Sequence, residues 1–343
     1  MRTNWQEKVQ KIKEKLKETS KVSILTHYNP DGDAVGSGLA LYHFLKDLNI
    51  DVTFVVPNSL PGFLRWIPGY EHIVVHKSAK EKAEKIISES DWLFALDFNH
   101  SDRIKEMEPL LLESKATKVL IDHHPEPQGF CDYSFSDIKA CSTSELIYEF
   151  IRLYDINYSI SKDIATAVYV GLMTDTGNFS YNSSNPETFR VLADLLECGI
   201  DKDEITSNVF DNFSADRMRL LGLSLNDRMH VLPEHNTAYI YLSLDDMRKF
   251  NYKQGDSEGF VNYPLSIKNI VFSAIFIEHK DFVKISFRSK GCFAVNKFSE
   301  KHFNGGGHRN AAGGNSKLSF MEAIQHFENI VEEYKEELNK ACE

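Results

Sequence analysis

The stretch VSILTHYNPDGDAVGSG, residues 22–38, constrains the fold more than any other part of the chain. Its first five residues are uncharged and rich in β-branched side chains, which is typical of a strand buried on both faces of a parallel sheet. From Gly36 onward the apolar residues recur at helical spacing. His27, Asp31 and Asp33 therefore lie where a strand passes into a helix, and open α/β sheets bind their ligands at such points.

Taken alone, Asp31 and Asp33 allow two interpretations. Two carboxylates this close in the chain repel each other unless a cation or a proton lies between them, which indicates a binding site. The alternative is an Asp-rich turn that only caps a helix. The residues at the ends of the other predicted strands distinguish between a binding site and a capping turn.

Other predicted strands in the first half of the chain end on similar residues. Strands alternate with helices there, which predicts an α/β fold with a doubly wound, mainly parallel sheet. One strand runs into Asp97, and another runs into Asp122, His123 and His124. Two adjacent histidines after a buried strand have little reason to be there for packing alone. The strands are expected at 52–56, 92–96 and 118–121, with helices at 79–88, 142–154 and 162–173.

These strand ends share one kind of ligand chemistry, since they supply aspartate and histidine but no cysteine. With Asp175, which follows a predicted helix, they suit Mn²⁺ or Mg²⁺ better than a structural zinc ion. Asp175 alone is more often a residue of a helix-ending turn than a ligand. The set exceeds the needs of one ion, so two ions about 3.5–4 Å apart are expected. Asp97 is the expected bridge because its strand is central.

Near residue 231 the predicted helices give way to predicted strands, which indicates a second, smaller α/β domain. Its last helix is amphipathic, and Ser319 and Glu322 are spaced as a capping box. Before that helix comes a glycine-rich run ending in His308, which is predicted as a loop. The expected parts are a catalytic domain (1–190), a helical connection (191–231) and a substrate-binding domain (232–343) across a cleft, with strands at 237–243, 271–277 and 282–287.

Composition narrows the partners and the compartment. A net charge of −11 does not favour long duplex nucleic acid, because affinity for duplex comes mainly from Lys and Arg. It allows a short phosphate ester whose charge metal ions neutralise. No apolar run approaches the ~18 residues needed to span a membrane. The N-terminal 20 residues read as an amphipathic helix rather than a signal peptide. Five dispersed cysteines favour a reducing cytoplasm.

The motifs resemble those of the DHH phosphoesterase superfamily. The matching segments are HYNPDGD at 27–33, Asp97, DHH at 122–124 and TDTG at 174–177. GGGH at 305–308, followed by AAG at 311–313, is similar to the signature of the DHHA1 domain. The resemblance covers about residues 20–315 and is nearest to the nanoRNase (oligoribonuclease) and pAp (3′-phosphoadenosine 5′-phosphate) phosphatase subgroup, also labelled exopolyphosphatase-related.

The resemblance implies a role for each residue of these motifs. Two divalent ions are implied, with Mn²⁺ expected and Mg²⁺ or Co²⁺ as alternatives. His124 would face the scissile phosphate, and Asp122 would hold the neighbouring histidine. The implied ligands are His27, Asp31 and Asp97 for one ion, and Asp33, Asp97, His123 and Asp175 for the other.

The second domain is expected to hold the substrate. Successive backbone N–H groups of Gly305, Gly306 and Gly307 can approach a phosphate closely, with His308 beside them, although most glycine runs are only turns. Arg288, at the end of a predicted strand, is a candidate bidentate phosphate clamp. The alternative for Arg288 is an ordinary surface arginine.

The function implied is hydrolysis of short single-stranded RNA to mononucleotides and of pAp to AMP. By this resemblance, two cations would lower the pKa of a bridging water and so supply a hydroxide for in-line attack on phosphorus. A cytoplasmic enzyme is expected, with a homodimer as an allowed assembly. The alternatives are a cyclic-dinucleotide or linear-dinucleotide phosphodiesterase and a non-catalytic nucleotide-binding protein.

Overall fold

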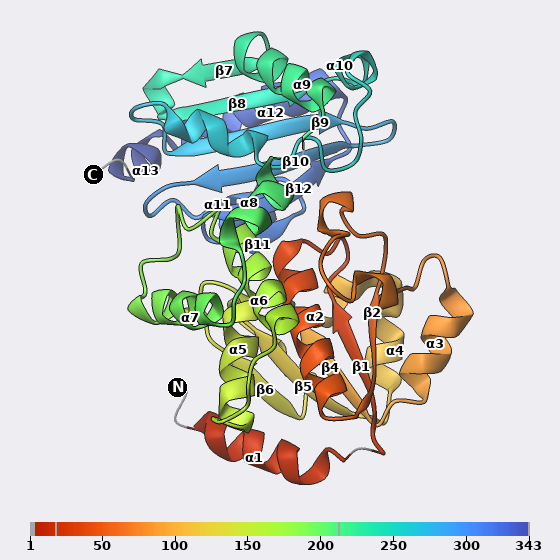
Figure 1. Cartoon of the computed structure of the whole chain (residues 1–343). Helices are drawn as coiled ribbons and strands as arrows, with labels where there is room; N and C mark the ends of the chain where they lie inside the picture. The colour runs from red at the N-terminus through yellow and green to blue at the C-terminus, as the bar shows by residue number, and fades with distance from the viewer. Residues whose placement is uncertain (1–3, 18, 212, 342–343) are drawn as a thin grey trace. The chain divides into compact units, whose positions relative to one another are not determined.

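The computed structural model describes residues 4–17, 19–211 and 213–341 (Figure 1). The chain divides into two compact units, residues 1–212 and 213–343. The division falls inside the segment that the sequence predicts as a helical connection. Two helices of that segment belong to the first unit and one belongs to the second. In the described ranges, no helix is both long enough and apolar enough to cross a membrane.

Unit 1 is built on a parallel sheet of six strands in the order β3-β2-β1-β4-β5-β6. The predicted doubly wound sheet is therefore confirmed. The strand order reverses between β1 and β4, so their C-terminal ends flank the crevice where such sheets bind ligands. The strands are β1 (Lys21–Thr26), β2 (Asp51–Val56), β3 (Val74–Val75), β4 (Trp92–Leu96), β5 (Thr117–Asp122) and β6 (Tyr133–Ser136).

Helices cover both faces of this sheet (Figure 1). Both faces of the central strand β4 are buried, as its uninterrupted apolar sequence predicts. One face packs against α1 (Trp5–Lys15), α2 (Gly32–Asp47), α5 (Thr143–Tyr154) and α6 (Lys162–Asp175), and the other against α3 (Lys80–Ser88) and α4 (Glu108–Glu113). The remaining helices of unit 1 are α7 (Pro186–Glu197), α8 (Lys202–Phe210) and the 3₁₀ helices η2 (Gly62–Leu64), η3 (Tyr70–His72) and η4 (Ser101–Met107).

Helices α2 and α6 approach each other closely because two glycines face each other at their contact. A Cβ atom on Gly36 would lie 2.5 Å from the carbonyl oxygen of Ala167 and 2.9 Å from the amide nitrogen of Gly171. Near the start of α2, Gly32 lies against the side chain of Thr174 at the end of α6, and a Cβ on Gly32 would be 2.3 Å from Thr174 Oγ1. The contact therefore brings the N-terminus of α2 to the C-terminus of α6.

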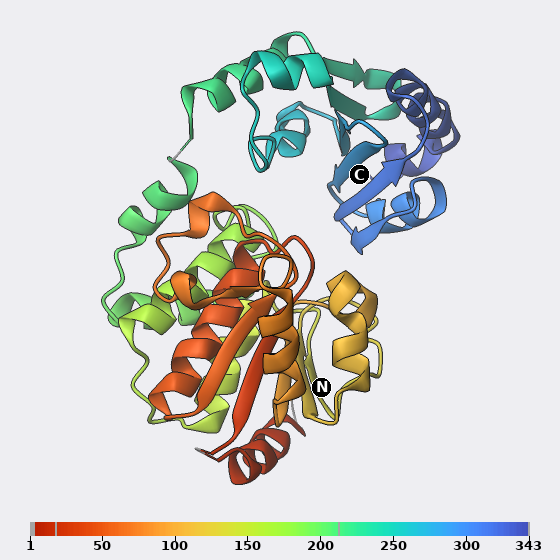
Figure 2. The same cartoon turned by 90° about the vertical axis from the view of Figure 1, so that its right-hand side faces the viewer.

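Unit 2 is built on a mixed sheet in the order β11-β12-β10-β9-β8-β7 (Figure 2). Only β8 and β9 pair in parallel among its described strands. The sheet packs α11 and α12 on one face and α9 and α10 on the other. The strands are β7 (Met229–Leu232), β8 (Thr237–Leu242), β9 (Phe272–Glu278), β10 (Val283–Ser289), β11 (Gly306–His308) and β12 (Ala311–Ser316). The helices are α9 (Ala215–Asn226), η5 (Pro233–His235), α10 (Leu244–Lys249), η6 (Phe260–Ser266), α11 (Val295–His302), α12 (Phe320–Glu333) and α13 (Lys335–Lys340).

Two local features of unit 2 can be compared with the sequence predictions, the cap of its last long helix and the glycine-rich run. Ser319 and Glu322 form the predicted capping box at the start of α12. The glycine-rich run, by contrast, forms the hairpin β11–β12 and not the predicted loop. A Cβ on Gly305 would lie 1.9 Å from the carbonyl oxygen of Gly313, and Gly307 has a φ of +142°. Gly305 is therefore required by a close backbone contact, and Gly307 by its left-handed backbone conformation.

We predict that Gly36→Ala lowers the stability of the protein by about 1–3 kcal/mol, because the new methyl group would force two helix backbones apart. Thermal unfolding followed by circular dichroism measures this effect. Gly222→Ala in α9 is the matched control, since a Cβ there meets nothing within 4 Å among the described atoms. That control is expected to gain about 0.5–1 kcal/mol from helix propensity. Equal unfolding temperatures for the two variants would contradict the packing argument.

Candidate metal centre

The centre lies at the C-terminal edge of the parallel sheet, where β1 and β4 are neighbours. His27 follows β1 directly, and Asp97 follows β4. Asp31 is the N-cap of α2, and Asp33 lies in its first turn. Asp175 is the last residue of α6, so the close α2–α6 contact brings it near Asp33. Strand β5 contributes Asp122 as its last residue, and His123 and His124 follow it.

One cluster joins the first strand to the fourth. His27 Nε2 lies 3.5 Å from Asp97 Oδ2 and 3.8 Å from Asp31 Oδ1. The ligand atoms of these three residues all lie within 4.8 Å of one another, close enough to hold one metal ion. Asp31 Oδ1 also accepts hydrogen bonds from the amides of Asp33 and Ala34, which fixes its direction.

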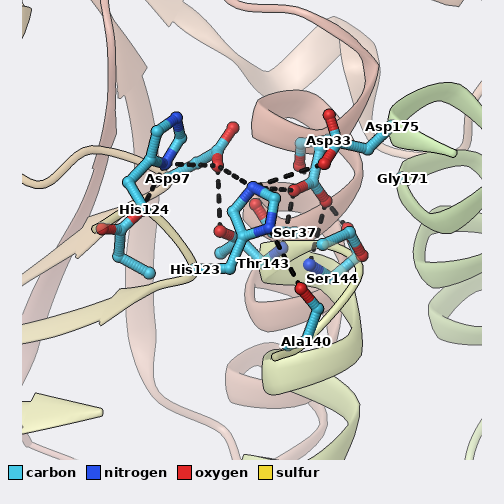
Figure 3. A network of polar contacts seen from close by, with 12 residues as sticks. Asp33, Ser37, Asp97, His123, His124, Ala140, Thr143, Ser144, Gly171 and Asp175 are labelled. Atoms are coloured by element: carbon cyan, nitrogen blue, oxygen red, sulfur yellow. Dashed lines mark hydrogen bonds and ion pairs between the residues drawn. The ribbon is translucent and has the colours of Figure 1, made fainter. Parts of the chain in front are cut away.

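A second cluster joins β5 to the helices α2 and α6 (Figure 3). His123 Nε2 lies 3.3 Å from Asp175 Oδ2 and 3.9 Å from Asp33 Oδ2. The same nitrogen lies 3.7 Å from Asp97 Oδ1. Asp97 therefore directs one carboxylate oxygen to each cluster, which is what a bridging ligand needs.

The spacing of these atoms fits bound cations better than direct hydrogen bonds. The nitrogen–oxygen distances of 3.3–3.9 Å are too long for good hydrogen bonds. Two ligand atoms that each lie about 2.1 Å from one ion are themselves about 3.0–4.2 Å apart, depending on the angle between them at the ion. Oxygen and imidazole ligands of this kind suit Mn²⁺ and Mg²⁺. The residues present thus fit a pair of divalent ions.

His124 has a different environment from His123. Its Nδ1 lies 2.7 Å from Asp122 Oδ1 and donates to that carboxylate, which is fully buried. The same nitrogen lies 3.7 Å from Asp97 Oδ1. Asp122 therefore fixes the orientation of the ring and holds a proton on Nδ1.

The start of α5 holds two of the carboxylates through contacts that were not predicted from the sequence. The amides of Thr143 and Ser144 donate to Asp33 Oδ2 and Oδ1 at 2.6 and 2.9 Å. The hydroxyl of Thr143 donates to Asp97 Oδ1 at 2.9 Å. Ser142 is the N-cap of α5. Unpaired amides are expected at any capped helix start, so a predicted helix beginning with Ser-Thr-Ser is the signal that could have found them.

Two residues near the centre have left-handed backbones, which is uncommon for residues other than glycine. Asp97 has a φ of +64°, and Asn29 has a φ of +58°. Asn58, which follows β2, accepts from the amide of Asn29 at 2.6 Å and donates to its side chain at 2.8 Å. Such strained positions concentrate at functional sites, where surrounding contacts maintain them.

Like charges and burial shift the pKa values of the centre. Burial raises the pKa of Asp33 well above its usual value, and the charges of Asp97 and Asp175 add to this. Burial also raises the pKa of Asp175, to about 6. Burial opposes the charged form of Asp97 too, but the neighbouring His27, His124 and His123 outweigh it and lower the pKa of Asp97.

The two histidines that face the carboxylates hold protons strongly. Burial alone would lower the pKa of His27, but Asp31 and Asp97 raise it to about 10. Burial likewise opposes protonation of His123, whose pKa the charges of Asp175, Asp33 and Asp97 raise to about 9. Protons on these rings compensate the carboxylates in the same way that cations would.

The structure places the predicted residues of unit 2 in one part of its sheet. Arg288 of β10 and His308 of β11 both pair with Ala311 of β12. Residues directly opposite each other in a sheet share a face, so Arg288 and His308 flank a small side chain on the same face. Gly306 and Gly307 belong to β11, and Gly305 precedes it.

The fold and the site together define a class of α/β proteins with an Asp- and His-rich metal centre at the switch point of a parallel sheet. Two family models match this chain. The model described as DHH family, N-terminal domain matches residues 21–172, and the DHHA1 domain matches residues 236–340. The chain belongs to the DHH phosphoesterase superfamily, as its motifs predict.

Three known proteins illustrate the range of relatives. The Thermus thermophilus protein named bifunctional oligoribonuclease and PAP phosphatase NrnA is 30% identical over 337 residues, which cover 98% of this chain and 96% of that protein. A solved structure from Bacteroides fragilis, described as an exopolyphosphatase-related protein, is 43% identical with a TM-score of 0.93 and 97% coverage of both chains. Cyclic-di-AMP phosphodiesterase GdpP of Bacillus subtilis is 26% identical over 338 residues, which cover 95% of this chain but 49% of GdpP.

We predict that the protein, stripped of metal by a chelator, loses stability as the pH rises from 6.5 toward 10. The pKa values of His27 and His123 are raised in the folded state, so their protons stabilise the fold below pH 6.5. That contribution disappears as the pH passes through about 9 and 10. Thermal unfolding measured at several pH values checks that the unfolding temperature falls as the pH rises.

The double variant His27→Gln/His123→Gln is the control for this pH series. It lacks both raised groups, so its unfolding temperature is expected to fall less over the same interval. If parent and variant lose stability equally, other groups titrate there and the assignment is wrong.

Proposed function

We propose that the chain is a two-metal phosphoesterase that hydrolyses short oligoribonucleotides to mononucleotides and pAp to AMP. The observation that carries the proposal is the orientation of Asp97. Its two oxygens face different Asp/His clusters, 3.5 Å from His27 and 3.7 Å from His123. A pair of bridged cations is the arrangement used by many phosphatases and nucleases.

The proposed ion pair uses residues from both clusters. When bound, the ions would lower the pKa of a water and neutralise charge on the phosphate. Mn²⁺ is the proposed ion, because carboxylates mixed with imidazoles suit it. The proposed ligands are His27, Asp31 and Asp97 for one ion, and Asp33, Asp97, His123 and Asp175 for the other.

His124 is the proposed proton donor. Its Nδ1 donates to buried Asp122, so a proton on Nε2 could pass to a phosphate oxygen or to the leaving group. Asp122 therefore acts through His124, by fixing the orientation of its ring.

The proposed substrates rest on the relative from Thermus thermophilus, which matches along nearly its whole length. Unit 2 would bind phosphate groups of these substrates. Arg288 offers a planar guanidinium that can bind a phosphate with two parallel hydrogen bonds. His308 lies on the same face of the sheet, two strands away, and Gly306 and Gly307 precede it in the edge strand β11. Their backbone amides are the proposed phosphate donors, whereas the amide of Gly305 already donates to the carbonyl oxygen of Ser299.

A cyclic-dinucleotide phosphodiesterase is the second candidate function. The observation in its favour is the match to GdpP, which spans most of this chain. Both candidates need the same metal centre, so they differ only in the substrate accepted. A nucleotide-binding protein without activity is the remaining alternative.

An activity panel separates these candidates. We expect the protein with Mn²⁺ to hydrolyse pAp and linear dinucleotides faster than cyclic dinucleotides, pyrophosphate or polyphosphate. Mg²⁺ and Co²⁺ replace Mn²⁺ in parallel assays. Faster turnover of cyclic dinucleotides would favour the second candidate, and no turnover of any substrate would favour the binding protein.

We predict that Asp97→Asn reduces turnover of pAp at least 100-fold while the protein stays folded. The amide cannot bridge two cations, but asparagine tolerates the left-handed backbone that this position requires. Rates at saturating pAp and a circular dichroism spectrum check both parts. Near-parental turnover in this variant would refute the bridged pair.

We predict that Arg288→Ala raises KM for pAp about tenfold or more, since a charge-assisted hydrogen bond is worth about 1.5–3 kcal/mol. Lys284→Ala is the control, because Lys284 is an exposed cation on the same face of β10. It is expected to leave KM unchanged. Equal effects of the two substitutions would indicate a general charge effect and no specific clamp.

A further inference from the structure

Thr143 contacts carboxylates that belong to both clusters of the metal centre (Figure 3). It is the first residue of α5 and is fully buried. Its amide donates to Asp33 Oδ2 at 2.6 Å, and its hydroxyl donates to Asp97 Oδ1 at 2.9 Å. We propose that Thr143 is a positioning residue that sets the spacing of the two metal ions by fixing the rotation of the bridging carboxylate. This inference rests on the proposed two-metal site.

The carboxylate of Asp97 needs such a restraint. Rotation about the terminal bond of an aspartate side chain is broad and weakly defined. At Asp97 this rotation decides which cluster each oxygen faces, since Oδ2 lies 3.5 Å from His27 and Oδ1 lies 3.7 Å from His123. A hydroxyl that donates to Oδ1 holds that oxygen on the side of the second cluster.

Asp33 is held by the same helix start. One of its oxygens accepts from Thr143 and the other from Ser144, so the plane of this carboxylate is fixed as well. Gly171 of α6 makes room for this contact, because a Cβ there would lie 1.9 Å from Ser144 Oγ and 2.7 Å from Asp33 Oδ1. A ligand of the second cluster and the bridging residue are therefore tied to one rigid element.

The hydroxyl of Thr143 has no role in capping α5 that would explain it. Ser142 already caps the helix, since its side chain accepts from the amide of Glu145 at 3.1 Å. The hydroxyl of Thr143 points instead to Asp97, 46 residues earlier in the chain. Partners that orient metal ligands in this way typically change metal affinity about 10–100-fold when they are removed.

Thr143→Val tests the inference, because valine keeps the shape and the backbone amide and removes only the hydroxyl. Mn²⁺ binding by equilibrium dialysis gives the number of ions bound per chain. Electron paramagnetic resonance reports whether two Mn²⁺ ions are close enough to couple. We expect Thr143→Val to bind one of the ions about 10–100-fold more weakly and to lose the signal of the coupled pair. Thr143→Ser, which restores the hydroxyl, is expected to regain both.

Thr188→Val is the matched control. Thr188 is also fully buried, and its hydroxyl donates to Glu145 Oε2 at 3.1 Å, away from the clusters. Thr188→Val is expected to lower the unfolding temperature by a similar amount to Thr143→Val. It is expected to keep the Mn²⁺ binding and the coupled Mn²⁺ signal of the parent. Equal loss of Mn²⁺ in both variants would overturn the inference, because general loosening of the fold would then explain it.

The results for the parent chain separate the two levels of the argument. If the parent binds two coupled Mn²⁺ ions and Thr143→Val does the same with equal affinity, the positioning role is refuted while the proposed function stands. If the parent binds fewer than two ions, the two-metal site is refuted and the role of Thr143 with it.

Discussion

Repulsion between buried carboxylates is the constraint on which this site depends. The doubly wound sheet brings Asp31, Asp33, Asp97, Asp122 and Asp175 together at one edge. Three of them, Asp33, Asp97 and Asp122, are buried away from the water that would screen their charges. Without cations the chain offsets part of this repulsion by protonating histidines and raising the pKa of Asp33. A protein that needed only a stable fold would gain by replacing some of these charges, so their presence argues for bound ions.

The fold holds these residues together by several local devices. Glycines at the α2–α6 contact let two helix backbones approach, so the ends that carry Asp33 and Asp175 meet. The amides at the start of α5 bind one carboxylate with the favourable end of a helix dipole. Asp97 has a left-handed backbone at the end of a fully buried strand. Each device costs stability or sequence freedom elsewhere, which is typical of a site arranged for chemistry.

The sequence reveals the clustered aspartates and histidines but not the contacts that orient them. Buried parallel strands have a clear apolar signature, so their ends, and the residues His27, Asp97 and His123, could be placed from the pattern alone. The Ser-Thr-Ser start of α5 indicates free helix amides, but its partners Asp33 and Asp97 could not be predicted, because these contacts join segments far apart in the chain. The hairpin at Gly306 was also missed, since glycine runs indicate turns unless the close approach of another backbone is known.

The two units differ in net charge, and this difference fits their proposed roles, metal binding in unit 1 and phosphate binding in unit 2. Residues 213–343 contain seventeen acidic and seventeen basic residues, so the whole net charge of −11 belongs to residues 1–212. A phosphate group would be repelled by that unit as long as its carboxylates lack cations. Two divalent ions would add four positive charges beside the five clustered carboxylates and would offset most of their negative charge. Binding of anionic substrates to unit 1 should therefore depend on the ions, whereas binding to Arg288 and His308 of unit 2 should not.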